Sequence, residues 1–252
     1  MKDLIKIVIS GSSGKMGRAV ADVISARDDC AVSAGIDLNP EKYSDFTVYT
    51  KVSELPDIPD VIVDFTHPSA LDGLLDYALT NGVALILAST GYTPEQTEKI
   101  KSASLQIPIF FTANMSLGIN LLRELAKKAA AVLGDQFDVE IVERHHNQKL
   151  DAPSGTALML AESINEARDG MYSYVYDRHS VRRKREPTEI GIHSLRGGTI
   201  VGEHEIVFAG RDEVITLSHS AASKEVFAVG AVNAAVFICG KAAGLYSMSD
   251  MI

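Results

Sequence analysis

The feature that most constrains this sequence is an alternation of short apolar runs and helix-compatible segments over its first 115 residues. Continuously apolar runs are typical of parallel strands that are buried on both faces. The alternation therefore predicts a doubly wound parallel sheet with helices on both faces. Strands are expected at residues 4–9, 31–36, 61–63, 83–88 and 107–111, and helices at residues 15–26, from Ser69 and from Thr93.

Helix-capping signals support this segmentation. Ser69 and Asp72 have the spacing of a capping box, and Gly82 supplies a left-handed stop for the helix that follows. The run Thr93-Pro94-Glu95-Gln96 combines an N-cap, a proline at the first helical position and a glutamine at the third. Both helices are therefore expected to begin close to these residues.

The pattern changes after Asn114. Residues 117–133 predict a helix, and from residue 137 apolar and acidic residues alternate as in a strand with one buried face. More strands are expected near residues 189–195, 205–208 and 214–219, and a last Ala- and Val-rich helix at about residues 224–239 suits packing on the first sheet. We therefore expect two domains, residues 1–115 with 224–252 and residues 116–223, the second a mixed α+β domain. The apolar stripe of the 117–133 helix is expected at Leu121, Leu122, Leu125, Ala129 and Val132.

Composition narrows the possible partners. The 252 residues hold 24 Lys and Arg against 33 Asp and Glu, a formal charge of −9 that argues against nucleic acid or an anionic membrane and favours a small soluble substrate. The apolar run nearest the N-terminus, Ile7 to Ile9, is too short for a signal peptide or a membrane span, so a cytoplasmic location is expected. Cys30 and Cys239 cannot form a disulfide framework and are expected as buried free thiols.

A glycine turn follows the first predicted strand and opens the first predicted helix. It reads Gly11-Ser12-Ser13-Gly14-Lys15-Met16-Gly17, a G-x-x-G-x-x-G spacing at the place where a Rossmann-type domain holds a dinucleotide pyrophosphate. Asp37, which lies 20 residues past Gly17, can accept hydrogen bonds from ribose hydroxyls. NADH is favoured because Asp37 would repel a 2′-phosphate, and NADPH stays open because Lys15 and Arg18 can supply positive charge.

The chemically densest stretch spans residues 140–157 and reads Glu-Ile-Val-Glu-Arg-His-His-Asn-Gln-Lys-Leu-Asp-Ala-Pro-Ser-Gly-Thr-Ala. His145, His146 and Lys149 leave the end of a strand, and a helix begins at Ser154. Cations that face a helix N-terminus suit the binding of carboxylates, and a histidine is the ordinary proton donor near neutral pH.

Other interpretations of these residues stay open at this point. His145 and His146 could be a metal pair or merely structural, although adjacent strand residues point to opposite faces. Ser154 could be a nucleophile, although its neighbours favour a helix cap. The run Arg182 to Arg185 is expected in a solvated loop, or close to a substrate or a neighbouring subunit.

Residues 140–157 also match the motif E-x-x-E-x-H-H-x-x-K-x-D-A-P-S-G-T-A, and through it the chain resembles the dihydrodipicolinate reductase (4-hydroxy-tetrahydrodipicolinate reductase) family over nearly its whole length. The resemblance implies NAD(P)H-dependent reduction of 4-hydroxy-tetrahydrodipicolinate to tetrahydrodipicolinate, in lysine and diaminopimelate biosynthesis. It implies that His145 donates or accepts a proton and Lys149 donates one. His146, Gly155 and Thr156 would contact the dicarboxylate substrate.

The same resemblance implies the roles of the two domains. The first would bind the dinucleotide, and the second would bind the substrate and form a homotetramer, with domain closure over the ligands. No metal is expected, since no further ligands accompany His145 and His146. Two segments depart from the family pattern, with Ala88 for a usual glycine and Met115 for a usual phenylalanine, and Lys224 stands where arginine is frequent. The implied cofactor contacts are Gly11, Ser12, Ser13, Gly14, Lys15, Met16, Asp37, Ala88, Ser89, Thr90, Thr112, Ala113, Asn114 and Met115.

Two other functions are compatible with the glycine turn alone. One is a related NAD(P)-dependent reductase of another small amino or imino acid, against which only the His-His-Lys segment argues. The other is a non-catalytic dinucleotide-binding regulator. The presence of both His145 and Lys149 argues against the regulator.

Overall fold

The computed structural model describes residues 4–40, 43–112 and 114–252. The chain divides into two compact units, Met1–Leu117 with Glu225–Ile252, and Gly118–Lys224. These bounds lie one or two residues from the expected domain limits. None of the helices in the described part of the chain is long and apolar enough to cross a membrane.

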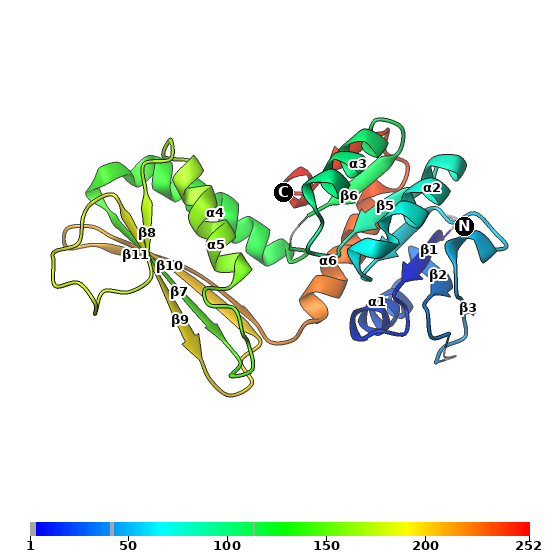
Figure 1. The fold of residues 1–252 in the computed structure, drawn as a ribbon, viewed down its shortest axis with the longest axis horizontal. Coiled ribbons are helices and arrows are strands. Elements are labelled where there is room, and N and C mark those ends of the chain that lie inside the picture. Colours follow the sequence, from blue (N-terminus) through cyan, green and yellow to red (C-terminus); the bar gives the residue numbers. More distant parts are fainter. Residues whose placement is uncertain (1–3, 41–42, 113) are drawn as a thin grey trace. The chain divides into compact units, whose positions relative to one another are not determined.

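The first unit is built on a parallel sheet of seven strands in the order β12-β6-β5-β4-β1-β2-β3 (Figure 1). Its alternation of strands and helices confirms the doubly wound fold predicted from the sequence. The strands are β1 (Ile5–Ser10), β2 (Cys30–Ile36), β3 (Val48–Tyr49), β4 (Val61–Asp64), β5 (Ala84–Leu87), β6 (Pro108–Phe111) and β12 (Gly244–Tyr246). The helices are α1 (Lys15–Ser25), α2 (Leu71–Asn81), α3 (Pro94–Ser104) and α6 (Glu225–Ile238).

Alternate residues of the buried strands supply two separate apolar cores. In β1, Ile7 and Ile9 face the core beneath α1 and α6, whereas Val8 faces the core beneath α2 and α3. This two-sided burial explains why the strands read as continuous apolar runs in the sequence. The predicted return of the last helix to the first sheet is confirmed, because α6 packs on α1 and on β4, β5 and β6.

The strand order reverses direction between β1 and β4. The connection that follows β1 leads to β2, and the connection that follows β4 leads to β5, so the two run in opposite directions along the sheet. A crevice therefore opens beyond the carboxyl ends of β1 and β4, where doubly wound folds bind ligands. The glycine turn follows β1 at this point, and Phe65 to His67 follow β4.

Of the three predicted helix-capping signals, one was wrong and two are confirmed. Ser69 does not cap α2: a 3-10 turn, Pro68–Ala70, precedes that helix, and the His67 side chain accepts the hydrogen bond from the Ser69 N–H. The box at Thr93 is confirmed, with Gln96 N–H donating to Thr93 Oγ1 and Thr93 N–H donating to Gln96 Oε1. Gly82 is left-handed at φ +70°, as expected.

The second unit is a mixed sheet of five strands in the order β11-β10-β7-β9-β8. The β7–β9 and β9–β8 pairs are parallel, and the β7–β10 and β10–β11 pairs are antiparallel. The helices α4 (Leu117–Leu133) and α5 (Gly155–Glu166) cover one face of this sheet (Figure 1). The strands are β7 (Asp138–His145), β8 (Ser173–Val175), β9 (Glu189–Arg196), β10 (Gly202–Ala209) and β11 (Val214–Ala221).

The buried stripe of α4 differs from the predicted one. Ile119, Leu122 and Ala126 are buried against the sheet, with Ala130, whereas Leu121, Leu125 and Val132 are exposed. The helix carries apolar residues on more than one face, so its sequence alone does not select the side that faces the core.

Candidate active site

The glycine turn of the first unit is shaped by close backbone approaches. Gly11 has φ +82°, a left-handed conformation that favours glycine. A Cβ at Gly17 would lie 2.2 Å from the carbonyl oxygen of Gly11, and one at Gly35 would lie 2.4 Å from Ser12 Oγ. The turn, the start of α1 and the end of β2 therefore pack against one another in a way that only glycines permit.

Asp37 lies at the end of β2, where its carboxylate holds the glycine turn. Its Oδ2 accepts the Ser13 N–H at 3.0 Å, and its Oδ1 accepts the Asn39 N–H at 3.0 Å. Because a carboxylate has about four acceptor sites, the two oxygens keep capacity for ribose hydroxyls.

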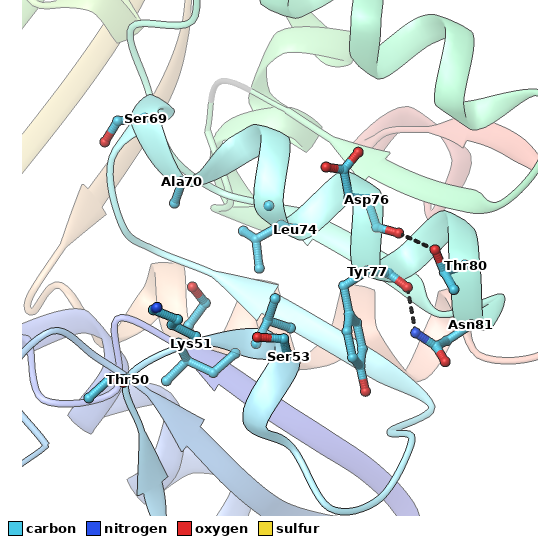
Figure 2. Close-up of a pocket in the computed structure, with 14 residues that line it drawn as sticks. Thr50, Lys51, Ser53, Ser69, Ala70, Leu74, Asp76, Tyr77, Thr80 and Asn81 are labelled. Atoms are coloured by element: carbon cyan, nitrogen blue, oxygen red, sulfur yellow. Dashed lines mark hydrogen bonds between the residues drawn. The ribbon is translucent and has the colours of Figure 1, made fainter.

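A hollow of about 550 Å³ opens at the reversal of strand order, within the usual size range of ligand pockets. A neighbouring hollow of about 570 Å³ lies between α2 and the segment that carries Thr50, Lys51 and Ser53 (Figure 2). The two share Ser10, Ile36, Thr50, Ser69 and Ala70 as lining residues. The first hollow is lined by Ser10, Gly11, Gly14, Ile36, Asp37, Leu38, Asn39, Thr50, Phe65, Thr66, His67, Ser69 and Ala70.

This shape fits a dinucleotide. Glycines bring the backbone close to the hollow, and the N-terminus of α1 adds unpaired N–H groups and partial positive charge. Asp37 lines the same hollow, and its carboxylate can accept hydrogen bonds there. Lys15 is exposed and Met16 is half-buried in the first turn of α1. The expected contacts Gly11, Gly14 and Asp37 thus line one hollow, whereas Thr66 and His67 were not predicted.

The expected contacts that follow β5 are not among the residues that line this hollow. Ser89 is buried, and its hydroxyl donates to Asp64 Oδ2 at 2.9 Å, which ties the ends of β4 and β5 together. Burial raises the pKa of the Asp64 carboxyl, although hydrogen bonds from neighbouring hydroxyls oppose this shift. Ala88 is half-buried and Thr90 is exposed. Their contact with a cofactor stays a prediction.

The segment after β6 is likewise structured by its own hydrogen bonds. Ser116 N–H donates to Asn114 Oδ1 at 2.8 Å, and Thr112 Oγ1 lies 3.3 Å from the Asn114 carbonyl oxygen. Met115 is 3% exposed and packs in the same core as α6, so its side chain is held inside the first unit. Its predicted contact with the nicotinamide is untested, and Ala113 lies outside the described residues.

In the second unit, the sheet face beneath the helices changes from apolar to polar along its length. Strand β7 places Val139 and Ile141 in the core, followed by Glu143 and His145 on the same face. The row at Glu143 runs across four strands as His219, His204, Glu143 and Ser194, and Arg196 stands beside His145 in the next row. The polar cluster is therefore one end of the core face.

Glu143 is the centre of this cluster and is fully buried. Arg196 donates to both of its oxygens at 2.8 Å, the Ser154 N–H donates at 3.0 Å, and His145 Nδ1 lies 2.6 Å from Oε2. Burial alone raises the pKa of a carboxyl, but the hydrogen bonds led by that of Arg196 outweigh it and lower the pKa of Glu143 to about 2. Glu143 is therefore ionised at neutral pH.

His204 packs against His145 with the ring centroids 5.3 Å apart in an edge-on arrangement. Its Nε2 lies 3.0 Å from Ser154 Oγ. Burial is the main cause that lowers the pKa of His204 to about 4, and electrostatic repulsion by the neighbouring His145 adds to it, so the His204 ring is neutral at neutral pH.

Ser154 caps α5. Its Oγ accepts the Ala157 N–H at 3.1 Å and also pairs with His204, while its backbone N–H is held by Glu143. A hydroxyl so engaged at a helix N-terminus is a structural group, and the nucleophile alternative is set aside.

The remaining predicted residues surround the same end of the sheet. Lys149 Nζ lies 2.9 Å from Asp151 Oδ1, and Lys149 N–H donates to the carbonyl of His146, which is half-buried. Gly155 is exposed at the first position of α5, and a Cβ there would meet nothing within 4 Å. Thr156 follows it in the first turn of the helix. The structure thus brings Lys149 and the start of α5 to the end of the sheet that carries His145.

The opposite face of the sheet carries a second cluster. Glu140 accepts from His193 Nε2 at 2.7 Å, from Arg178 at 2.7 Å and from Arg185 Nε at 3.0 Å. Arg183 pairs with Glu189. The run Arg182 to Arg185 lies in a loop as expected, and Arg182 and Arg183 are exposed. Arg183 and the half-buried Arg185 nevertheless bind carboxylates of this sheet, which the sequence did not predict.

Among the described residues, no group of three or more His, Cys, Asp or Glu side chains is placed to hold a metal ion. Sequence reasoning named His145 and Lys149 but missed Arg196 and His204, which lie far along the chain. Glu143 could have been predicted from the sequence, because it stands two residues before His145 and therefore lies on the same face of the strand.

A Rossmann-type dinucleotide domain joined to a mixed α+β unit with a His-Lys-Glu cluster defines the class of two-domain nicotinamide-dependent oxidoreductases. The family model for the N-terminus of dihydrodipicolinate reductase matches residues 5–115, and the model for its C-terminus matches residues 118–252. The chain belongs to the dihydrodipicolinate reductase family.

Similar proteins extend over the full chain. The 4-hydroxy-tetrahydrodipicolinate reductase of Caldanaerobacter subterraneus subsp. tengcongensis is 48% identical, with 99% of this chain and 98% of the relative covered. That of Clostridium novyi is 43% identical with the same coverage. The dipicolinate-bound dihydrodipicolinate reductase from Paenisporosarcina sp. TG-14 is 27% identical with a TM-score of 0.84, covering 99% of this chain and all of that one.

Proposed function

We propose that the chain catalyses the NAD(P)H-dependent reduction of 4-hydroxy-tetrahydrodipicolinate to tetrahydrodipicolinate, a step of lysine and diaminopimelate biosynthesis. The observation that carries this proposal is the cluster at one end of the second sheet. There an ionised, buried Glu143 holds His145, and cationic Lys149 and the N-terminus of α5 lie nearby. This arrangement occurs in a chain that the family models match in both halves.

The groups of this cluster suit a cyclic imine dicarboxylate. Lys149 and His146 would bind one carboxylate, and the N–H groups of Gly155 and Thr156 another, because cations and helix N-termini both favour anions. The open space above Gly155 leaves room for such a group. The bound dipicolinate of the Paenisporosarcina relative, itself a small dicarboxylate, supports this substrate class.

His145 is the proposed proton donor, and Lys149 is proposed to donate a proton and to bind a carboxylate. The bound nicotinamide supplies the hydride, and the chain orients the substrate and exchanges the protons that accompany loss of water and reduction. Binding of the dinucleotide by the first unit and of the substrate by the second follows from the same assignment.

NADH is the proposed preference. Asp37 places a negative charge at the ribose position, which disfavours a 2′-phosphate. Arg18, a possible phosphate ligand, instead donates to the Ser13 carbonyl through Nε and lies over the Tyr43 ring, with 4.4 Å between Cζ and the ring centroid. We expect kcat/KM for NADH to exceed that for NADPH by about tenfold, the equivalent of about 1.4 kcal/mol.

The test is oxidation of NADH and NADPH followed at 340 nm, with the substrate generated in situ from aspartate semialdehyde and pyruvate by the synthase that precedes this reaction. Turnover with either cofactor supports the proposed reduction, and the ratio of kcat/KM values tests the preference. Tight cofactor binding without turnover would contradict the assigned substrate. An Asp37→Ser variant should narrow the ratio without changing the affinity of the second unit for dipicolinate.

Self-association follows only from the family resemblance. We propose a homotetramer, which light scattering of the purified chain tests directly.

A further inference from the structure

The carboxylate of Glu143 has more partners than charge neutralisation requires. A buried carboxylate is stable only when it is paired and hydrogen-bonded, and the two N–H groups of Arg196 with the Ser154 N–H already meet that need. The contact with His145 Nδ1 is additional and, at 2.6 Å, shorter than those from Arg196 and Ser154. This contact points to a role in the chemistry of His145.

We propose that Glu143, clamped by Arg196, is a positioning residue that fixes His145 with its proton on Nδ1, so that Nε2 is the atom that exchanges a proton with the substrate. The inference rests on the proposed function for its consequence in catalysis. Its structural part, the tautomer of His145, is independent of the substrate.

The direction of the hydrogen bond follows from the charge of Glu143. Because this carboxyl is ionised at neutral pH, it can only accept, and the facing Nδ1 must carry a hydrogen. The neutral ring then has its lone pair on Nε2, and the imidazolium gives up its proton from the same atom. In the described part of the chain, the structure gives Nε2 no hydrogen-bond partner.

Space is kept beside Nε2 by a glycine. A Cβ at Gly202, on the adjacent strand β10, would lie 3.2 Å from His145 Nε2. That distance is tighter than most Cβ contacts, so any other residue there would crowd the atom that we assign to proton exchange.

The groups that face His145 leave Glu143 as its direct counter-charge. Arg196 on β9 binds Glu143, and Lys149 in the loop after β7 is paired with Asp151. His204 on β10 is neutral. At the start of α5, the cap residue Ser154 adds a hydroxyl but no charge. Glu143 is therefore the carboxylate in direct contact with the His145 ring.

Glu143→Gln tests the proposal. The amide oxygen would keep the hydrogen bonds from Arg196 Nη2 and the Ser154 N–H. The amide NH₂ would replace the oxygen that accepts from Arg196 Nη1, would face Nδ1 and would reverse the tautomer of His145. In a Ser-His-Asp triad the equivalent change lowers kcat by about 10⁴-fold through the wrong tautomer, and here we expect a fall of about 100-fold or more. The alkaline limb of the pH profile of kcat should also move, because the negative charge that faces Nδ1 is removed.

The matched control is Glu140→Gln. Glu140 also pairs with a histidine at 2.7 Å and with arginines, but on the opposite face of the same sheet. This variant should keep kcat within about twofold and leave the pH profile in place. Glu143→Asp, which retains the charge, should restore the alkaline limb of the profile toward the wild-type position.

A second measurement needs neither turnover nor a stable variant. In wild-type protein labelled with ¹⁵N-histidine, the neutral ring of His145, assigned by its loss in His145→Gln, should show a protonated Nδ1. A protonated Nε2 in wild type, or a Glu143→Gln variant with an unchanged tautomer and pH profile, would overturn the proposal. If the chain failed to turn over the dipicolinate precursor while the Nδ1 tautomer was present, only the assigned substrate would be wrong.

Discussion

One sheet of the second unit carries a Glu-His-Arg cluster on each face, and the two clusters differ in burial. On the face beneath α4 and α5, Glu143 is fully buried between His145 and Arg196. On the other face the Glu140 side chain is 24% exposed, beside a His193 side chain that is 40% exposed. The hydrogen-bond distances from the glutamate to its histidine are nearly equal, 2.6 and 2.7 Å.

The comparison shows that pairing alone does not make a site. Both carboxyls have a lowered pKa because hydrogen bonds outweigh the effect of burial, but only Glu143 stands where the core face ends at a helix N-terminus. Low exposure strengthens electrostatic interactions, and the α5 terminus adds an anion-binding group. The cluster around Glu140 instead ties the segment of Arg178 to Arg185 to the sheet.

Substitution of each cluster's histidine by glutamine should give the largest difference in kcat between the two clusters. His145→Gln removes the proposed proton donor, and we expect kcat to fall by about 10²- to 10⁴-fold while the affinity for NADH stays within about threefold. His193→Gln removes the histidine of the open cluster and should leave kcat nearly unchanged. Steady-state kinetics and cofactor titration measure both variants.

Near wild-type turnover in His145→Gln would remove this residue from catalysis. An equal loss in the two variants would instead indicate that damage to either cluster distorts the whole sheet.

Loss of an arginine should separate the clusters by stability. Arg196→Met leaves the buried charge of Glu143 without its bidentate partner, and we expect the free energy of unfolding to fall by about 3 kcal/mol. Arg178→Met removes a partly exposed guanidinium, while Glu140 keeps Arg185 and His193 and the buried Glu189 keeps Arg183, so a loss of at most about 1 kcal/mol is expected. Urea unfolding followed by circular dichroism compares them, and equal losses would contradict the role assigned to burial.

The sequence predicted the first unit more closely than the second for a physical reason. Parallel strands buried on both faces read directly as apolar runs, and the turn at Gly11 and the box at Thr93 are local signals. The short strands β3 and β12 were missed, because two or three residues give no periodicity.

The candidate site was predictable only where it is local in the chain. His145, Lys149 and Ser154 fall within one segment, and periodicity could have added Glu143. Arg196 and His204 are brought to the site by the pairing of strands: β9, parallel to β7, places Arg196 beside His145, and β10, antiparallel to β7, places His204 beside Glu143. Register depends on tertiary packing, which the pattern of a single strand does not specify.

A further difference between the clusters, which appears only on acidification, concerns the stability of the buried cluster. His204 has a folded pKa of about 4 against an ordinary value of 6.5, so between these values the unfolded chain binds the proton more readily. The free energy of unfolding should therefore fall as the pH decreases from 6.5 to 4, and His204 should account for about 3 kcal/mol of that loss. Glu143 acts in a lower window, since its stabilisation is present above pH 4.5 and is lost as the pH falls toward 2.

His204→Asn isolates the contribution of this histidine, because the amide can pair with Ser154 but does not titrate. The variant should lose less stability than wild type between pH 6.5 and 4, with the difference measured by urea unfolding at several pH values. His193→Asn on the open face is the matched control. If both variants flattened the pH dependence of the free energy of unfolding equally, burial beneath α5 would not be what separates the two clusters. A flattening confined to His204→Asn would instead tie the neutral state of the His204 ring to its place beside His145.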